Sequence, residues 1–542
     1  MSLWTNGWAR HLTKQNLILA FIVLAAFIVR IWSLEMKPPH FDEGINGHFV
    51  MQMWKDGFYR YDPTNFHGPL YFYFLQMSEV IFGRGIFGFR FVTLLFSVGT
   101  VLVVGLHKRF FGNAALWAAA MLAFGPASVF YARYAIHEWL FILLQVIFVY
   151  GFYLYREEKS RLAVTCMVAG FLGTFAVKET FFVFFGTWLI AIYVERFTNR
   201  LWPADKPVAS SQKLSRKERK ALEKEQVVST SAPLDPARKA DFFAITAIGV
   251  MIVLALFSGF FVHMEGILDM FRAFMFWTKT GTAASGHEKP FVYWIELLWR
   301  YEWPGLLALA LSPIIYFNVS RPARVMVVTS FGTWLAYSLI PYKTPWLILN
   351  ILWPLAFTLG FAVEVAKKFA EKFAIKPLAA AMQIVILFTL ATAAQIMLRL
   401  NFVDFVNPKE AYVYVQSTMQ FKNAMDWINA RVKQRPEDLN MKLLVLNKDT
   451  WPMPWLLGGF PNLNWGKPED ADLTNASVIL IDASMRETLE KRLTGKYWVQ
   501  PFHIRDAYDE GWAYFEFHQF QGILPSNSPI FDSATKKEGG QG

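Results

Sequence analysis

Residues 87–106 read FGFRFVTLLFSVGTVLVVGL, a twenty-residue stretch whose one charged side chain is Arg90. About 20 mostly apolar residues in a helix cross the hydrocarbon core of a bilayer, which is roughly 30 Å thick. Ten further stretches have the same character. The eleven predicted spans are residues 16–34, 87–106, 114–130, 139–155, 162–177, 181–194, 242–263, 304–317, 325–340, 346–363 and 378–397. The sequence therefore predicts an all-α polytopic membrane domain over residues 1–400.

The composition agrees with this prediction. The 542 residues are 54% hydrophobic, 17% aromatic and only 18% charged, where a soluble domain has about 25% charged residues. Disorder, a fibre and an ordinary cytosolic enzyme are excluded. The single cysteine, Cys166, lies within an apolar run, so no intrachain disulfide can form. The net charge of +11 is concentrated beside the spans, and we expect no nucleic-acid partner.

Basic residues follow every second span, which fixes the predicted orientation. The clusters are Arg10 with Lys14, Lys108 with Arg109, Arg156 with Lys159 and Arg161, residues 195–240, Arg321 with Arg324, and residues 367–376. By the positive-inside rule these clusters face the cytoplasm, so the N-terminus is expected on the cytoplasmic side of the inner or plasma membrane and the residues beyond about 401 on its outer side. The basic loop 195–240 is expected to attract anionic membrane lipids.

One apolar stretch, residues 66–82, is left out of the spans because counting it would move every later basic cluster to the outer side. Its polar positions and its row of aromatic residues favour an interfacial helix within an outer loop, residues 35–86.

The last part of the chain changes character. A helical period through residues 411–432 is followed by short β-type runs KLLVL, SVILID, WVQPFHI and WAYFEFH. Residues 401–530 are therefore expected to form a small α/β domain outside the membrane, with a disordered tail at 531–542. The domain is rich in aromatic residues, which either bind carbohydrate through their ring faces or fill the core. They are Trp451, Trp455, Trp465 and Tyr497.

The first outer loop contains two adjacent carboxylates, Asp42 and Glu43, just after the first span. On a helix, Asp42 and Asn46 lie on the same face. Carboxylates at a membrane surface are costly to desolvate unless a partner or substrate meets them. The alternative is a helix cap with a solvated glutamate beside it.

Other outer segments contribute polar candidates. His67 precedes a Gly-Pro bend, and the alternative is a hydrogen-bonded surface histidine. In RYAIHEW, Arg133, His137 and Glu138 form a candidate phosphate or metal cluster, with a salt-bridged loop as the equal alternative.

Two lysines lie in tight outer turns. Lys178 is followed by Glu179, which is itself a sufficient partner for a lysine near the interface. Lys343 lies between two prolines in PYKTPW, where it either meets an anion or extends to lipid headgroups. The sequence has no phosphate-binding glycine loop, CxxC, GxSxG or HExxH motif, so hydrolase and ATPase functions lack their usual support.

The ordered motifs resemble a known family. They are FDEGINGHF (41–49), RYDPTNFHGPLYF (60–72), FYARYAIHE (130–138), TFAVKET (174–180), YKTPWL (342–347), YVYVQST (412–418) and WPMPWLL (451–457). Together they resemble the polyprenyl-phosphate-sugar-dependent membrane glycosyltransferases of the C-type fold. This superfamily includes the glycosyltransferase 39 proteins, the protein O-mannosyltransferases and the lipid A aminoarabinose transferases. The branch named for flippase-associated activity is the most similar.

The resemblance implies a scaffold of about eleven spans with an outward-facing cavity. Asp42 matches the catalytic first-loop aspartate of the family, and Glu43 matches its companion. Glu138 falls where the family more usually has an aspartate. Lys178 and Lys343 match the KE and Y-K/R-x-P-W positions, although the branch often carries an arginine and a following acid where this chain has Lys343 and Thr344.

The resulting hypothesis is an inverting transfer of a hexose or pentose from a polyprenyl-phosphate donor to a lipid, glycan or protein acceptor at the outer face. Asp42 is expected to act as general base. The residues expected near the donor phosphate are Arg133, Lys343, Lys178 and His67, with a divalent metal ion as a candidate at His137 and Glu138. The alternative is a transporter or flippase-associated accessory for lipid-linked sugars, but the charges gather at the outer ends of the spans and no repeat is visible, which favours the enzyme.

Overall fold

The computed structural model describes residues 13–65, 67–203, 236–282, 286–372, 376–505 and 510–534. Most of the basic loop (204–235) and most of the predicted disordered tail (535–542) lie outside these residues. The helices of the first part, called the bundle here, are α2 (Lys14–Ile31), α3 (Phe41–Asp56), α4 (Leu70–Phe82), α5 (Ile86–Leu106), α6 (Lys108–Phe111), α7 (Asn113–Phe124), α8 (Pro126–Phe130), α9 (Glu138–Glu158), α10 (Arg161–Phe175), α11 (Phe181–Leu201), α13 (Pro236–Phe257), α14 (Gly266–Thr282), α15 (Tyr293–Tyr301), α16 (Trp303–Asn318), α17 (Arg321–Leu339), α18 (Ile348–Lys372) and α19 (Lys376–Phe402).

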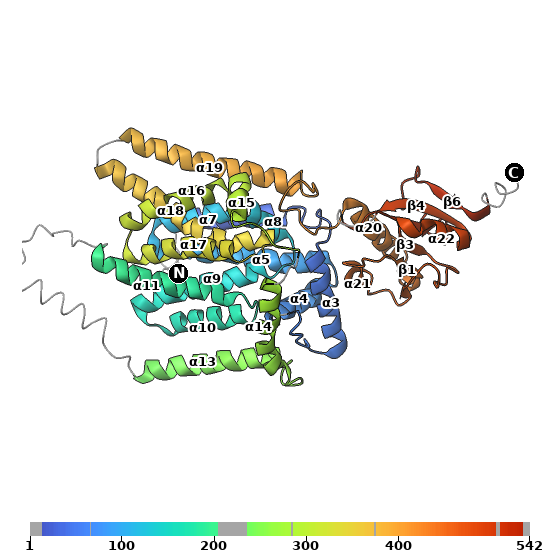
Figure 1. Cartoon of the computed structure of the whole chain (residues 1–542), viewed down its shortest axis with the longest axis horizontal. Helices are drawn as coiled ribbons and strands as arrows, with labels where there is room; N and C mark the ends of the chain where they lie inside the picture. The colour runs from blue at the N-terminus through green and yellow to red at the C-terminus, as the bar shows by residue number, and fades with distance from the viewer. Residues whose placement is uncertain are drawn as a thin grey trace, which may run out of the picture.

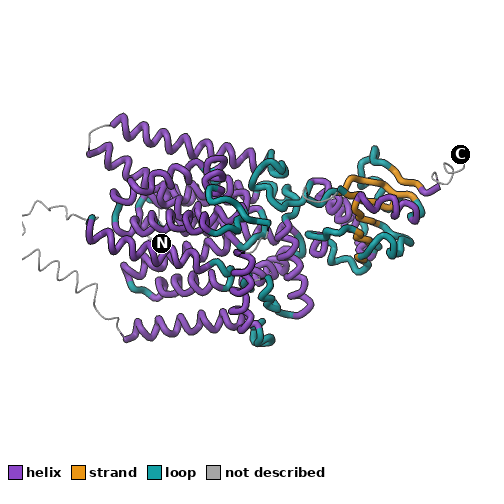
Figure 2. Tube along the Cα trace, viewed as in Figure 1, coloured by secondary structure: helices purple, strands orange, loops and turns teal. Residues whose placement is uncertain are grey.

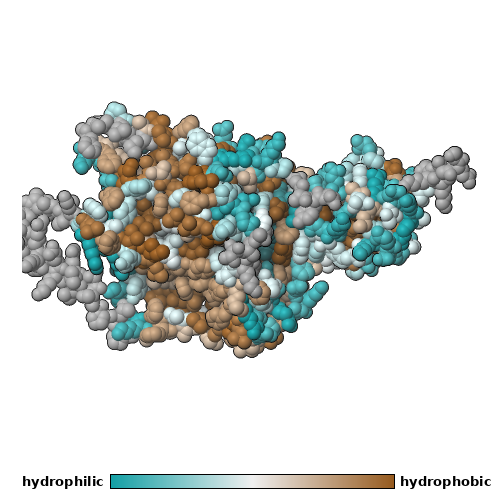
Figure 3. All heavy atoms as spheres, viewed as in Figure 1, coloured by the Kyte–Doolittle hydropathy of each residue, from teal (hydrophilic) through white to brown (hydrophobic). Residues whose placement is uncertain are grey.

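The bundle confirms the predicted membrane fold, and each predicted span coincides with a helix. Among the described residues, seven helices are long and apolar enough to cross a membrane, and an eighth is counted if α7 and α8, bent by 58° at Gly125, form one span. Helices α10 and α16 are apolar but shorter, and α17, which covers the predicted span 325–340, is not among the seven. The chain is an integral membrane protein. Its apolar side chains form a wide band over the bundle (Figure 3).

The arrangement of the bundle gives it two distinct ends (Figure 1). The apolar part of helix α18 is wholly buried, and the helix packs against α7, α16, α17 and α19. Helices α3 and α4 lie at the end that faces the C-terminal α/β part, which we call the domain end. The end of α11 and the start of α13, which flank the basic loop, lie at the opposite end. Helix α4 covers most of the stretch predicted to be interfacial, and it is too short to be counted among the spans.

Arg30 and Arg90 are two of the arginines buried inside the bundle, and each is held by several hydrogen bonds. Arg30 donates to the Ser97 hydroxyl (2.8 Å) and to three backbone carbonyls at the end of its own helix and of α7. Arg90 pairs with Glu43 and donates to three carbonyls after the first span. A charge in a low-dielectric interior persists only with such partners, so these arginines fix how α2, α3, α5 and α7 meet.

The C-terminal part is the predicted α/β fold, and it contains all the described strands (Figure 2). Its elements are α20 (Met419–Gln434), β1 (Leu443–Leu446), α21 (Met453–Leu456), β2 (Leu463–Trp465), β3 (Val478–Asp482), α22 (Arg486–Arg492), β4 (Lys496–Phe502), β5 (Gly511–Glu516) and β6 (Ile530–Asp532). The strand order is β2-β1-β3-β5-β4-β6, with β1 parallel to β2 and β3 and the remaining pairs antiparallel.

Side-chain alternation along β1 explains how the sheet is covered on both faces. Leu443 and Val445 pack in the cluster that contains α20, whereas Leu444 and Leu446 pack in the cluster that contains α22. Helix α20 begins at Met419, later than the helical period from residue 411 suggests, because Thr418 caps it and the preceding residues pair with the bundle.

The four aromatic residues of this part have different environments. Trp455 and Tyr497 are buried, which favours their role in packing. Trp451 is half-buried. Trp465 is 43% exposed on the edge strand β2, so it is the one with the most open ring. A carbohydrate contact there stays a prediction.

The α/β part is docked on helix α3 through two glycines. A Cβ atom at Gly44 would lie 2.4 Å from the Pro452 Cβ, and one at Gly47 would lie 2.1 Å from Cγ of Trp455. The Trp455 ring also stacks on Phe89 of α5, with ring centroids 4.8 Å apart. Any larger side chain at either glycine would therefore push the α/β part away from α3.

Candidate functional site

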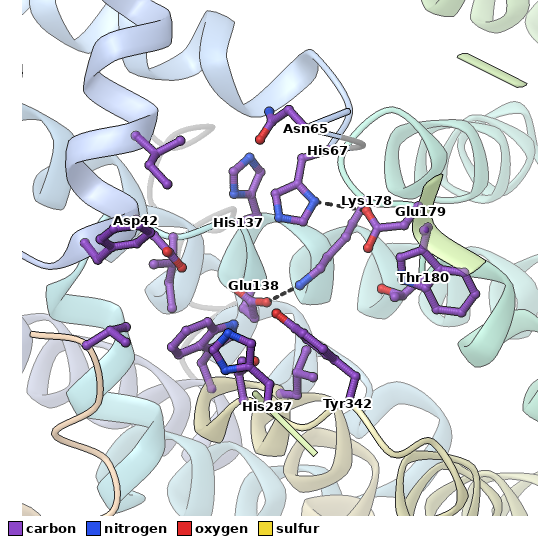
Figure 4. A pocket seen from close by; sticks show the side chains of 18 of the residues that line it. Asp42, Asn65, His67, His137, Glu138, Lys178, Glu179, Thr180, His287 and Tyr342 are labelled. Carbon is purple, nitrogen blue, oxygen red and sulfur yellow. Dashed lines mark hydrogen bonds and ion pairs between the residues drawn. The ribbon is translucent and has the colours of Figure 1, made fainter. Parts of the chain in front are cut away.

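A cavity of about 340 Å³ lies at the domain end of the bundle. Figure 4 shows the polar side chains that converge on it from separate segments. They come from α3, the loop before α4, the start of α9, the turn between α10 and α11, and the segments before α15 and α18. These residues are Asp42, Asn65, His67, His137, Glu138, Lys178, Glu179, Thr180, His287 and Tyr342, joined by Arg505 from the α/β part.

Asp42 lies in the first turn of α3 and faces this cavity (Figure 4). The helix cap is His40 and not Asp42: the Nδ1 atom of His40 accepts the Asp42 N–H (3.1 Å), while Glu43 accepts the His40 N–H (2.9 Å). In the described part of the chain, no hydrogen bond or ion pair engages the Asp42 carboxylate. The start of a helix is a favourable position for a carboxylate, and this one is left available to a substrate.

Glu43 is the adjacent carboxylate, but the structure places it outside the cavity. Its two oxygens accept from Arg90 Nε and a terminal Arg90 nitrogen (both 2.8 Å), and from the N–H groups of His40 and Ala135. Both partners of the ion pair are fully buried. Arg90 and these N–H groups hold the pKa of Glu43 low although burial opposes its charge. The geometry thus gives Glu43 a structural position, holding α3 against α5.

Lys178 is at the centre of the opposite wall. Its ammonium donates to Glu138 at the start of α9 and lies near Glu179. Burial opposes its charge, but Glu138 and Glu179, with a contribution from Asp42, outweigh burial and raise the pKa of Lys178. Backbone bonds from Gly68 and Leu70 to the turn between α10 and α11 bring His67 to the same place. The sequence motifs around residues 67, 138 and 178 therefore do meet in one site.

The two predicted histidines also lie together. His67 Nδ1 is 3.0 Å from a Glu179 carboxylate oxygen, and its ring centroid is 4.6 Å from that of His137. Burial, followed by the nearby His67 and Lys178, lowers the pKa of His137 well below its ordinary value. Within the described residues, no group of three or more His, Cys, Asp or Glu side chains is arranged to hold a metal. A divalent metal at His137 and Glu138 stays a prediction.

Arg133 and Lys343, predicted near the donor phosphate, point elsewhere. Arg133 is buried and donates to the carbonyls of Trp32, Ser33 and Asn401. The Lys343 ammonium donates to the carbonyls of two loop residues, Lys289 (3.0 Å) and Ile340 (2.6 Å). Neither side chain is among those lining the cavity. The neighbours of Lys343 do line it, so the YKTPW motif reaches the site through Tyr342 and Thr344 rather than through its lysine.

Several lining residues were not predicted, and three of them bear on the argument below. Tyr342 lies within the YKTPW motif, which could have indicated it. His287 comes from a long outer segment, and its Nδ1 is 2.7 Å from the Tyr414 hydroxyl. Arg505 follows β4, and its guanidinium lies over the Phe41 ring, 4.4 Å from the ring centroid. No local pattern marks Arg505, because its position depends on how the α/β part is docked.

The fold has counterparts among solved structures, although no protein-family model and no curated protein matches the sequence. ArnT from Cupriavidus metallidurans, bound to undecaprenyl phosphate, is similar with a TM-score of 0.55 and 14% identity over 94% of this chain and 99% of ArnT. The apo state of ArnT is similar with a TM-score of 0.54 and 13% identity over 96% of this chain and 99% of ArnT. A third similar structure is the archaeal oligosaccharyltransferase AglB from Archaeoglobus fulgidus in complex with an inhibitory peptide and a dolichol-phosphate. Its TM-score is 0.49, with 12% identity over 98% of this chain and 76% of AglB.

The chain therefore has the C-type fold of membrane glycosyltransferases, which is the fold that its motifs resemble. At this level of identity the likeness covers the architecture.

Proposed function

We propose that this protein is an inverting glycosyltransferase that moves a sugar from a polyprenyl-phosphate donor to an acceptor at the outer face of the membrane. The observation that carries the proposal is Asp42, whose carboxylate faces a cavity at the end of a C-type bundle with no hydrogen-bond partner in the described residues. ArnT, which has the same architecture, is bound to undecaprenyl phosphate in its structure.

Asp42 has the properties that a general base needs. The acceptor hydroxyl must lose its proton as its oxygen attacks the anomeric carbon, and a positioned carboxylate contributes about 10²- to 10⁴-fold to the rate of such a step. Tyr342 borders the same cavity, and burial followed by the charges of Asp42 and Glu179 raises the pKa of its phenol. Tyr342 therefore stays protonated and can donate a hydrogen bond to a sugar or phosphate oxygen.

The opposite wall is suited to the leaving phosphate. In an inverting displacement the nucleophile and the leaving group lie on opposite sides of the anomeric carbon, so Asp42 and Lys178 on facing walls match the two positions. The Lys178 ammonium remains charged beside Glu138, and the His67 ring lies at the same wall. A developing phosphate charge would be stabilised there by groups that are already oriented.

A donor-cleavage assay tests this proposal. The full chain, reconstituted in liposomes, is given a polyprenyl-phosphate sugar and an envelope fraction as acceptor. Release of free polyprenyl phosphate with sugar incorporation supports the transferase. Movement of intact donor between leaflets without cleavage would support the transporter instead and contradict the proposal.

A further inference from the structure

We infer that Arg505, from the α/β part, binds the donor phosphate together with Lys178, so that the α/β part is a component of the donor site. This inference rests on the proposed function for the identity of the ligand. Arg505 lines the same cavity as Asp42 and Lys178, and its side chain is 5% exposed. It is thus an almost buried cation at the site, contributed by a different part of the chain.

The charge balance of the cavity shows why a second cation is needed. The bundle lines it with three carboxylates, Asp42, Glu138 and Glu179, and with one ammonium, Lys178. Burial lowers the pKa of His137 and of His287, which therefore add little positive charge. A phosphate bound by Lys178 alone would therefore lie in a cavity with more carboxylates than cations. Arg505 is the other permanently charged cation among the described lining residues, so it reduces the excess of carboxylates over cations from two to one.

Backbone pairing holds Arg505 in place relative to Asp42. Residues 415–418, which we call the strap, run between α3 and the α/β part. On one side the Phe41 N–H donates to the Val415 carbonyl (3.3 Å), and the Ser417 N–H donates to the carbonyl of Pro39 (3.0 Å). On the other side the Thr418 N–H donates to the Ile504 carbonyl (3.0 Å). Arg505 is therefore tied through one short strap to the segment that carries Asp42.

The contacts of the guanidinium leave it suited to this role. It lies on the face of Phe41, next to Asp42 in the chain, and it pairs with Asp449 of its own part. A guanidinium has five N–H donors in a planar fork that matches two phosphate oxygens, whereas Lys178 offers a single point charge. Asp449 is not among the residues that line the cavity, so it orients Arg505 without adding a carboxylate there.

Donor binding by the full chain tests the inference. Wild type and variants in nanodiscs are titrated with undecaprenyl phosphate. Arg505→Gln should weaken binding about 10- to 100-fold, the usual loss for a hydrogen-bonded charged contact, and Arg505→Lys should fall between the two. The matched control is Arg486→Gln. Arg486 also pairs with a carboxylate, Glu490, and also lies over a ring, that of Trp512, but it is not among the cavity-lining residues.

A second variant separates binding from packing. Asp449→Asn removes the carboxylate that pairs with Arg505 but leaves the charge of Arg505, so it should lower thermal stability while undecaprenyl phosphate still binds within a few-fold of wild type. Equal binding by wild type and Arg505→Gln would overturn this inference and leave the proposed function standing. Equal loss of binding in Asp449→Asn and Arg505→Gln would also overturn it, because Arg505 would then act only through packing. If wild type itself does not bind undecaprenyl phosphate, both proposals fail.

Discussion

Replacing Glu43 by glutamine separates the roles of the two adjacent carboxylates. Each Glu43 oxygen accepts from one Arg90 nitrogen and from one backbone N–H. Whichever way the glutamine amide is turned, its NH₂ group would face two N–H donors, and the buried Arg90 would lose its counter-charge. Breaking a buried ion pair by removing one partner costs about 3–5 kcal/mol, so Glu43→Gln should lower the stability of the protein by about that amount.

The assay compares apparent unfolding temperatures in detergent for Glu43→Gln and Asp42→Asn. The second variant makes the same chemical change one residue earlier, at a carboxylate without a hydrogen bond in the described structure, and should unfold at the wild-type temperature. Adding Arg90→Met to Glu43→Gln should not restore stability, because three carbonyls bound by Arg90 would lose their donor. A stable Glu43→Gln protein that has lost only transfer activity would refute this reasoning and make Glu43 a residue of the site.

Three further predictions follow from the same geometry. Lys178→Met should lower both the affinity for the donor, measured by titration in nanodiscs, and the unfolding temperature, because Glu138 would lose its partner. The double variant Lys178→Met with Glu138→Gln should recover the unfolding temperature but not the affinity. Because burial lowers the pKa of His137, the unfolded chain takes up a proton below about pH 6.5 that the folded protein resists, so stability should be highest above this pH and fall below it. His137→Gln should flatten the dependence of the unfolding temperature on pH between about pH 5 and 8. An unchanged slope would contradict this prediction. Gly47→Ala should reduce transfer and expose the α/β part to limited proteolysis, because its Cβ would collide with the Trp455 ring, and a fully active, protease-resistant variant would show that the docked arrangement is not required.

Features encoded locally could be predicted from the sequence. Spans are long apolar runs, and the short β-type runs at β1 and β3 mark strands, so the membrane fold and most of the sheet could be predicted. The short edge strands β2 and β6 have only three residues each and lack such a signal. The start of α20 was misplaced because the residues before Thr418 pair with the bundle, a contact that a helical period does not reveal.

The candidate site was only partly predictable, because its charges are paired over long distances in the chain. The outer-loop argument correctly brought residues 42, 67, 138 and 178 to one cavity. The same argument did not predict that Glu43 forms an ion pair with Arg90, because Arg90 was considered only as a charge within a predicted span. Arg505 depends on the docking of a separate part of the chain, so no pattern near it in sequence could have indicated it.

The most direct measurement is the rate at which reconstituted Asp42→Asn releases polyprenyl phosphate from a polyprenyl-phosphate sugar, compared with wild type in the same membranes. Loss of a general base should slow release by about 10²-fold or more, while undecaprenyl phosphate binding and the unfolding temperature remain at wild-type values. Turnover within a few-fold of wild type would contradict the assignment of Asp42 as the base.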